Sequence, residues 1–338
     1  MTAPPMARRM SSYTPPEGKL DPMDFELPAS VITVSGTSRL WVVGMNGSDL
    51  SMRALRLGAF LMSPSYKNHD TILAINIVKT DAPEGDDVTL FGKCNEAVRS
   101  CGAIPERVLT CKTIRLPEGW TPGDALVYYS NHISPPCGGE TRLVIGAQGN
   151  DDKGSASKLG DIALQCLAKA KVPVVLVKEG WKHLAHGEQG KLSRKKRMGN
   201  NDEDGIKVVC AVDGTEIGEL AFDTAVSMCR EGDVLHAVHV KTDSEVSAKA
   251  ERFFQGECAK VQASKKLQEC VFKTVDPAVG GLTVSEALID ASYEADLMIL
   301  GTVELNTIKK RHLLGSVPLN IAKGSGAHMV VVKRYPHA

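Results

Sequence analysis

Hydrophobic and polar residues follow one another along this chain in short apolar runs separated by longer amphipathic segments. The runs are rich in Val, Ile and Leu and predict β-strands, while the segments between them repeat apolar residues every three or four positions and predict helices. The expected strands are 39–45, 71–79, 107–115, 142–147, 173–178, 207–212, 233–241, 268–275, 296–301 and 328–333. The expected helices are 49–62, 93–103, 121–132, 159–170, 216–230, 244–264, 284–294 and 316–323. This alternation predicts parallel sheets with helices on both faces.

The sequence contains an internal repeat, in which the same order of strands, glycine turns and helices occurs twice. Two glycines precede a valine-rich run that ends in lysine, with the same spacing at Gly146, Gly160 and Lys178 as at Gly301, Gly315 and Lys333. Upstream, WVVGMNGS (41–48) and VVCAVDGT (208–215) form a second matched pair, each a strand that breaks into a glycine turn. An internal repeat of this size predicts two copies of one compact unit.

Two segments fall outside the repeat. Residues 1–36 are rich in Pro and lack periodicity, which predicts a disordered tail. Residues 183–206 carry the basic cluster RKKR (194–197) and then acidic residues, which predicts a solvated linker; a nuclear-import or nucleic-acid patch is the less favoured interpretation. We therefore expect a first domain at 37–182 and a second at 207–336.

Composition narrows the function classes. The 40 basic and 40 acidic side chains cancel, so no global field favours nucleic acid or a membrane surface. The sequence contains no run of 18 apolar residues, so no membrane span is predicted. The N-terminus lacks the apolar core of a secretory signal. The 9 cysteines are scattered singly, which favours reduced thiols. Together these features predict a cytoplasmic protein.

Candidate chemistry lies where strands end and helices begin, because ligands of open parallel sheets bind there. In the second copy a strand ends at Gly301, the basic residues 309–311 follow, and Gly315 precedes Ser316 at an expected helix start. Glycines let backbone N–H groups approach an anion, and the helix start adds positive potential. Ser316 is expected to cap the helix and donate its hydroxyl to a phosphate, although Gly315 and Ser316 also suit a turn and a cap without any ligand.

The first copy is less suited to phosphate. It carries Gly146, Gly149 and Gly160, but Asp161 stands where the second copy has Ser316. Aspartate is a good helix cap, yet its carboxylate at the helix start repels a phosphate.

The turns after the first strand of each copy also indicate that the second copy is better suited to a nucleotide than the first. The second copy has Asp213-Gly214-Thr215, and the first has Asn46-Gly47-Ser48. An aspartate at a strand end can accept hydrogen bonds from a ribose or a base, whereas Asn46 is neutral. Both tripeptides also suit plain turns.

The second copy resembles the universal stress protein family in the segments KVVCAVDGTEIGELAFDTAV, VLHAVHV, ADLMILGT and LLGSVPLNIAKGSGAHMVVVKR, and residues 38–180 resemble it more weakly. The resemblance implies two tandem α/β domains of the adenine-nucleotide α-hydrolase-like type. Each would be a five-stranded parallel sheet with strand order 3-2-1-4-5. It also implies an internal pseudo-dimer packed through the last strands, 173–178 and 328–333, with a further homodimer as an option.

The nucleotide-binding members of this family carry Gly-x2-Gly-x9-Gly-Ser/Thr after the fourth strand. The resemblance therefore implies an adenine nucleotide, ATP first, in the second domain, with Mg²⁺ as its counterion and no other metal. The implied contacts are Asp213 for the adenosine, Ala237 for the base, and Gly301, Gly315, Ser316 and Val317 for the phosphates, with Gly214, Thr215 and Thr302 as further nucleotide-binding candidates. The weaker counterparts in the first domain are Asn46, Gly47, Gly146, Gly149 and Gly160. Glu304 replaces the second glycine of the family pattern, and the loop is one residue longer.

Three functional hypotheses remain open. The chain lacks a GxxxxGK[ST] loop, an HxGH run and a Gly-x-Ser-x-Gly elbow, so an ATP-consuming enzyme is the weakest and no catalytic residue is nominated. A nucleotide-binding regulatory protein of the stress response is favoured over an interaction protein whose two sites are lost. Gly315→Asp separates these two: it should abolish phosphate binding, or otherwise cost only stability.

Overall fold

We describe a computed structural model of the chain over residues 39–62, 70–79, 87–133, 139–148, 159–178, 205–242, 244–303 and 314–334. The predicted tail, the RKKR cluster and most of the predicted linker lie outside these ranges. No helix within them combines the length and the apolar composition that a membrane crossing requires.

The first half of the chain forms five strands and their connecting helices. The strands are β1 (Leu40–Met45), β2 (Thr71–Val78), β3 (Leu109–Arg115), β4 (Thr141–Gly146) and β5 (Val174–Val177). The helices are α1 (Asp49–Leu61), α2 (Asp87–Ser100), the short α3 (Pro105–Val108), α4 (Pro122–His132) and α5 (Asp161–Lys169). The helix predicted at 93–103 begins earlier in the structure, at Asp87. The sequence pattern missed this start because the buried residues are confined to Cys94, Ala97 and Val98, so the first turns carry no apolar stripe.

The second half repeats this order. Its strands are β6 (Lys207–Ala211), β7 (Val234–Val240), β8 (Glu269–Val275), β9 (Leu297–Val303) and β10 (His328–Arg334). Its helices are α6 (Glu216–Met228), α7 (Ser244–Lys265), the 3₁₀ turn η3 (Pro277–Val279), α8 (Val284–Ala291) and α9 (Ser316–Gly324). Ile206, placed in the linker by the sequence, is buried and donates its N–H to Asp233, so the packing of the second domain already includes it.

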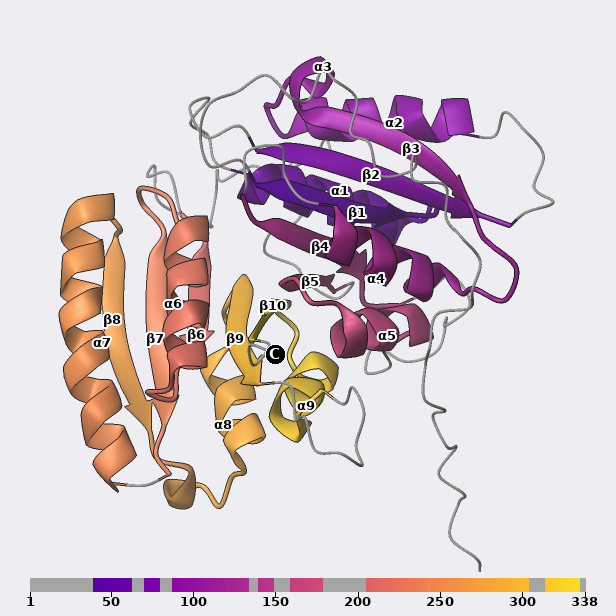
Figure 1. Ribbon diagram of the computed structural model, residues 1–338. Helices are drawn as coiled ribbons and strands as arrows, with labels where there is room; N and C mark the ends of the chain where they lie inside the picture. Colours follow the sequence, from indigo (N-terminus) through magenta and orange to yellow (C-terminus); the bar gives the residue numbers. More distant parts are fainter. Residues whose placement is uncertain are drawn as a thin grey trace, which may run out of the picture.

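The two halves share one sheet of 10 strands in the order β3-β2-β1-β4-β5-β10-β9-β6-β7-β8. Within each half the order is 3-2-1-4-5 and all pairs are parallel, as predicted. The halves join through β5 and β10, which pair antiparallel with Val175 opposite Val330 (Figure 1). The apolar last strands therefore cover each other, which removes two sheet edges that would otherwise be exposed.

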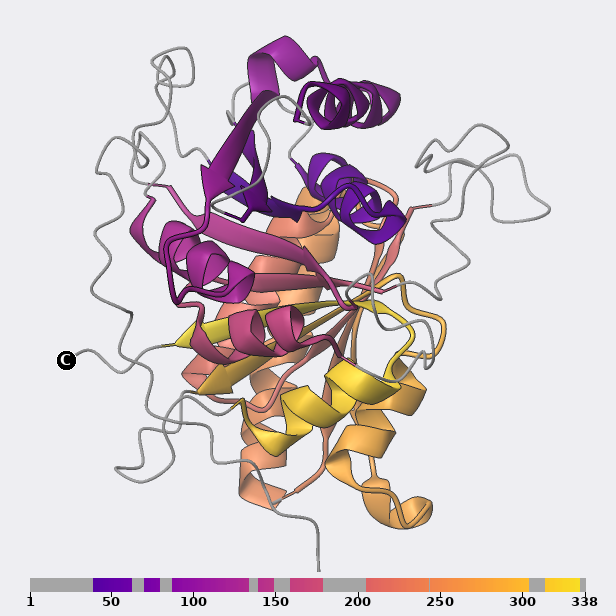
Figure 2. The ribbon, with the colours of Figure 1, turned by 90° about the vertical axis from the view of Figure 1, so that its right-hand side faces the viewer.

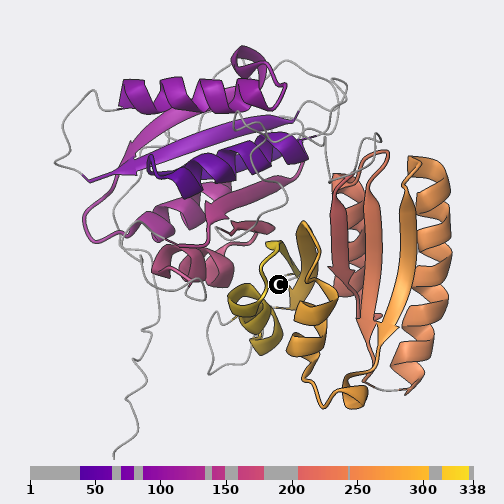
Figure 3. The same ribbon diagram turned by 180° about the vertical axis from the view of Figure 1, so that it is seen from behind.

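Helices cover both faces of the sheet. Residues of α1, α2, α6 and α7 pack in one hydrophobic cluster, and residues of α4, α5, α8 and α9 pack in another. The two layers of the first half are visible in turn, with α4 and α5 in front in Figure 1 and α1 in front in Figure 3. Because the central strands have apolar neighbours on both faces, they are nearly continuous apolar runs in the sequence, whereas the edge strands β3 and β8 are less buried.

Two buried lysines cross the junction between the domains. Lys178 follows β5, and its Nζ donates to the carbonyl oxygen of Ala322 in α9. Lys333 in β10 makes the equivalent contact in the opposite direction: its Nζ donates to the carbonyl oxygen of Ala170, at the end of α5 in the first domain, at 2.9 Å. Cations are favourable at helix C-termini, where carbonyl groups lack partners. The repeated lysine of the two valine-rich runs thus ties each domain to a helix of the other, around the yellow β10 at the centre of Figure 2.

His328 makes this junction sensitive to acid. Its Nδ1 accepts the backbone N–H of Lys178 at 3.1 Å, so the ring is held neutral. Burial, and then the charges of Arg53 and Lys178, lower the pKa of His328 to about 3. The unfolded chain binds this proton near pH 6.5, so stability is lost as pH falls below that value. We expect the free energy of unfolding to drop by about 2 kcal/mol between pH 6.5 and pH 4.5 from this group.

Urea unfolding at a series of pH values tests this expectation. His328→Asn is the matched control, because its amide oxygen can accept the same N–H and does not titrate. The variant should lose less stability than the unmodified protein over this range. Equal slopes in the two proteins would show that His328 is not the group responsible.

Candidate functional site

The turn after β6 holds Asp213 in a fixed orientation. Its Oδ1 accepts the backbone N–H of Thr215 at 3.0 Å and the hydroxyl of Thr215 at 2.5 Å. Gly214 sits between them at φ +75°, a conformation that favours glycine. No hydrogen bond among the described residues uses Oδ2, and the side chain is exposed. One carboxylate oxygen is therefore structural and the other faces outward, at the carboxyl end of the strand.

The start of α9 differs from its predicted form. Gly315, not Ser316, is the N-cap, and it supplies no side-chain hydrogen bond. Ser316 is the first helical residue, and its side chain is exposed. The first turn contains no acidic residue, and Pro318 has no N–H group. Among the described residues, no side chain caps the N–H groups of Ser316 and Val317 at the start of this helix.

Thr302 and Gly315 come together at this helix start. A Cβ atom built on Gly315 would lie 3.6 Å from the hydroxyl oxygen of Thr302 and 3.5 Å from Cδ of Pro318, which are ordinary contacts. The backbone of Gly315 is at φ −56°, a conformation open to any residue. The expectation that a substitution at Gly315 costs stability is therefore wrong. Glu304 and the basic residues 309–311 of the same loop lie outside the described ranges.

The other repeated glycine serves packing. A Cβ on Gly301 would lie 2.6 Å from Cγ1 and 2.7 Å from the carbonyl oxygen of Ile217 in α6. In the first domain a Cβ on Gly146 would lie 2.8 Å from Cγ of Leu50 in α1. Both glycines let the fourth strand of a domain approach its first helix, so their spacing in the sequence carries a packing requirement.

Ala237 lies deeper than the other predicted contacts. It pairs with Cys210 in the middle of β7 and is fully buried in the core. His239, two residues further along, is closer to the turn: one ring nitrogen lies 2.9 Å from the carbonyl oxygen of Val212, and the other lies 2.9 Å from Ser247 Oγ in α7. The sequence offered no signal for this link, which holds the residue before Asp213 in place.

The turn after β1 repeats the geometry with a neutral side chain. Oδ1 of Asn46 accepts the backbone N–H of Ser48 at 3.1 Å and its hydroxyl at 2.7 Å. Gly47 has φ +76°. Ser51 lies beside this turn, where its hydroxyl donates to the carbonyl oxygen of Ser48. The amide nitrogen of Asn46 is left facing outward, so this domain presents a donor where the second presents a carboxylate oxygen.

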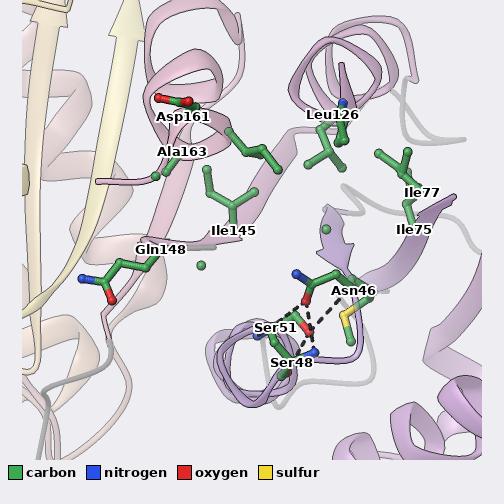
Figure 4. A pocket seen from close by; sticks show the side chains of 16 residues that line it. Asn46, Ser48, Ser51, Ile75, Ile77, Leu126, Ile145, Gln148, Asp161 and Ala163 are labelled. Carbon is green, nitrogen blue, oxygen red and sulfur yellow. Dashed lines mark hydrogen bonds between the residues drawn. The ribbon is translucent and has the colours of Figure 1, made fainter. Parts of the chain in front are cut away.

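A cleft of about 460 Å³ opens beside Asn46, at the carboxyl ends of β1, β2 and β4. Figure 4 shows Ile75, Ile77, Leu126 and Ile145 around it, with Asn46 at one side. Its lining residues are Gly44, Met45, Asn46, Ser48, Ser51, Ile75, Ile77, Pro122, Leu126, Ile145, Gly146, Gln148, Gly160, Asp161, Ile162 and Ala163. Three of the weaker candidates predicted from the sequence, Asn46, Gly146 and Gly160, line this cleft. Sequence reasoning did not predict its apolar walls, because they come from separate elements of the chain.

The start of α5 forms one rim of this cleft. Gly160 is the N-cap and makes no side-chain hydrogen bond, so the predicted capping role of Asp161 is wrong. Asp161 is instead the first helical residue and is exposed. Its carboxylate still lies at the positive end of the helix, where it partly cancels the attraction for anions. Gly149, the remaining candidate of this domain, lies outside the described ranges.

The described residues hold no cluster of three or more His, Cys, Asp or Glu side chains that could bind a metal ion. The eight cysteines within these ranges are free thiols. His236 is buried beside Glu269, at 3.4 Å, and not beside another ligand-type residue of its own strand. This part of the chain therefore offers hydrogen-bonding groups and helix starts, and no metal centre.

Comparisons with known proteins agree with this architecture. Residues 206–333 match the model of the universal stress protein family. Among solved structures, a universal stress protein candidate from Pseudomonas aeruginosa UCBPP-PA14 is 13% identical, with 90% of this chain and 95% of that chain covered and a TM-score of 0.51. A protein of unknown function from Pseudomonas aeruginosa PAO1 is 12% identical, with 90% and 94% covered and a TM-score of 0.51. The cytoplasmic domain of a prokaryotic cation chloride cotransporter is 11% identical, with 88% and 95% covered and a TM-score of 0.50. No curated protein matches the chain. At these identities the likeness to solved structures shows the fold, and it extends over both domains.

Proposed function

We propose that this chain, whose residues 206–333 form a universal stress protein domain, is a regulatory protein that binds an adenine nucleotide, ATP first, in that second domain. Binding, and not turnover, is the activity proposed, because the sequence nominates no catalytic residue. The observation that carries the proposal is the outward carboxylate oxygen of Asp213 at the end of β6.

Asp213 supports recognition of the adenosine part. Its Oδ1 is already occupied by Thr215, so the side chain cannot swing away without losing two hydrogen bonds. Its Oδ2 can accept hydrogen bonds from the 2′- and 3′-hydroxyls of a ribose, and hydrogen bonds to a charged acceptor are stronger than neutral ones. Because the orientation is fixed before binding, little conformational entropy is lost when the ligand arrives.

The start of α9 supports recognition of the phosphates. It combines uncapped N–H groups of Ser316 and Val317, the hydroxyl of Thr302 nearby and a first turn without acidic residues. Such helix starts bind anions through backbone N–H groups and the helix dipole. Mg²⁺ would arrive with the phosphates, since the described residues offer no separate cluster for it.

The proposal is tested by denaturing the purified protein and identifying any released nucleotide by mass spectrometry, followed by calorimetric titration of the emptied protein with ATP. We expect a bound adenine nucleotide, or saturable binding of added ATP with one site per chain. A protein that carries no nucleotide and binds none would overturn the proposal.

Asp213→Asn is the sharpest single substitution for the adenosine contact. Asn46 shows that asparagine makes the same turn, so the fold should be retained. The variant lacks the second carboxylate oxygen, and we expect ATP affinity to fall about tenfold, which is the usual range for losing a hydrogen bond to a charged group. Calorimetry measures the change, and an unchanged affinity would place the adenosine elsewhere.

The alternative function is an interaction protein that binds no nucleotide. The first domain favours it, because Asn46 and Asp161 both remove features that a nucleotide requires. A similar fold is found in the cytoplasmic domain of a prokaryotic cation chloride cotransporter, where it is one part of a longer protein. This alternative applies if neither domain binds ATP.

A further inference from the structure

We infer that the cleft of the first domain is a second ligand site, which binds an uncharged and largely apolar small molecule through a carbonyl oxygen. This inference does not depend on nucleotide binding by the second domain, because it rests on other residues. It assigns the two domains different ligands, although they share one fold.

The walls of the cleft set the apolar character of the ligand. Ile75 and Ile77 come from β2, Leu126 from α4 and Ile145 from β4, and in Figure 4 their side chains surround the same space. A volume of about 460 Å³ lies within the range of small-molecule sites, roughly 300–1,000 Å³. Mostly apolar walls with a few fixed polar groups are the usual composition of such sites.

Asn46 sets the polar contact. Its Oδ1 is occupied by the N–H and the hydroxyl of Ser48, and the hydroxyls of Ser48 and Ser51 are bonded within the same turn. What remains is the amide nitrogen, which donates and cannot accept. No hydrogen bond among the described residues uses it. The matching ligand group is a neutral acceptor, and a carbonyl oxygen is the common one.

The same residues disfavour a nucleotide in this cleft. A ribose hydroxyl finds no free acceptor oxygen on Asn46, unlike on Asp213 of the second domain. A phosphate at the start of α5 would meet the carboxylate of Asp161, and like charges about 4 Å apart repel strongly even near a protein surface. The start of α5 therefore disfavours a negatively charged group, and Asn46 favours a hydrogen-bond acceptor.

Nile red is a suitable probe, because it is uncharged, apolar, carries a carbonyl oxygen and fluoresces more strongly in an apolar site. We expect saturable binding to the full chain with one site per chain, unaffected by excess ATP. Asn46→Asp should weaken it about tenfold, because aspartate keeps the turn, as Asp213 does, but loses the N–H donor. Ile77→Arg should abolish it, because a bulky charged side chain then replaces a half-buried wall of the cleft.

Asp213→Asn is the matched control, and it should leave probe binding unchanged while it weakens ATP. Circular dichroism of each variant confirms that the domains are folded. The inference is overturned if Asn46→Asp binds the probe as well as the unmodified protein, if Ile77→Arg retains the probe, or if ATP displaces the probe stoichiometrically. Loss of ATP binding alone contradicts the proposed function and leaves this site standing.

Discussion

Replacing Gly315 by aspartate is expected to remove ATP binding, by about 100-fold or more in affinity, while the second domain stays folded. The substitution places a carboxylate at the N-cap of α9, where the phosphates are proposed to lie. Two unit charges 4 Å apart repel by about 4 kcal/mol near a protein surface, and each 1.4 kcal/mol is a tenfold change in affinity. Calorimetric titration with ATP measures the effect.

The fold should tolerate this change. Gly315 has φ −56°, and a Cβ there meets its neighbours at ordinary distances. Aspartate is among the preferred N-cap residues, and a negative charge at a helix start is itself favourable. We therefore expect the melting temperature of Gly315→Asp to equal or slightly exceed that of the unmodified protein, so that lost binding cannot be assigned to unfolding.

Gly315→Asn is the matched control. Asparagine has the same shape, caps a helix equally well and carries no charge. It should keep ATP affinity within a few-fold of the unmodified protein. If the aspartate and asparagine variants bind ATP equally well, no phosphate lies at the start of α9, and the proposed site in the second domain fails.

The fold was predictable from the sequence because its signals are local. The central strands are apolar runs and most helices have an apolar stripe, and the turns at 41–48 and 208–215 match between the two copies. The pairing of β5 with β10 was implied by the resemblance to the family, and it covers two apolar edges that would be unfavourable if exposed. The boundary of α2 was missed, since its first turns are exposed and carry no periodic pattern.

The contacts around the site and the domain junction were predicted less well, because they join residues that lie far apart in the sequence and meet only in the folded chain. The lysines at 178 and 333 marked the repeat in the sequence, but their partners lie more than 140 positions away, in helices of the opposite domain. The link from His239 to Val212 and Ser247 is likewise not visible as a motif. A cap is set by backbone geometry of a single residue, which is why Ser316 and Asp161 were each placed one position too early in the helix.

The two glycines of the repeated pattern in the second domain, Gly301 and Gly315, differ in what their surroundings require of them. Gly315 is the N-cap of α9 and a Cβ there meets only ordinary contacts, so packing does not require glycine at this position. Gly301 is constrained by α6 whether or not a ligand binds. The shared spacing of the two glycines therefore does not show whether the loop binds a ligand or whether the strand packs closely. Substituting each glycine separately does distinguish these two requirements.

Gly301→Ala is expected to destabilise the second domain by about 1–3 kcal/mol, which is the usual cost of forcing a methyl group into a packed interior. The new Cβ would lie 2.7 Å from the carbonyl oxygen of Ile217, a backbone atom of α6 that cannot rotate away. Urea unfolding followed by circular dichroism measures the loss. Gly146→Ala should cost less, because its nearest neighbours are side-chain atoms of Leu50, which can change rotamer.

Gly315→Ala completes the comparison, since it adds the same methyl group where the contacts are ordinary. It should cost at most about 1 kcal/mol, because alanine is a poorer N-cap residue than glycine. Ile217→Val should restore little of the stability lost in Gly301→Ala, because the clash with the carbonyl oxygen remains. If Gly301→Ala is instead as stable as the unmodified protein and loses ATP binding, the glycine is required by the ligand. Packing against α6 then does not explain why glycine recurs at the end of the fourth strand in both domains.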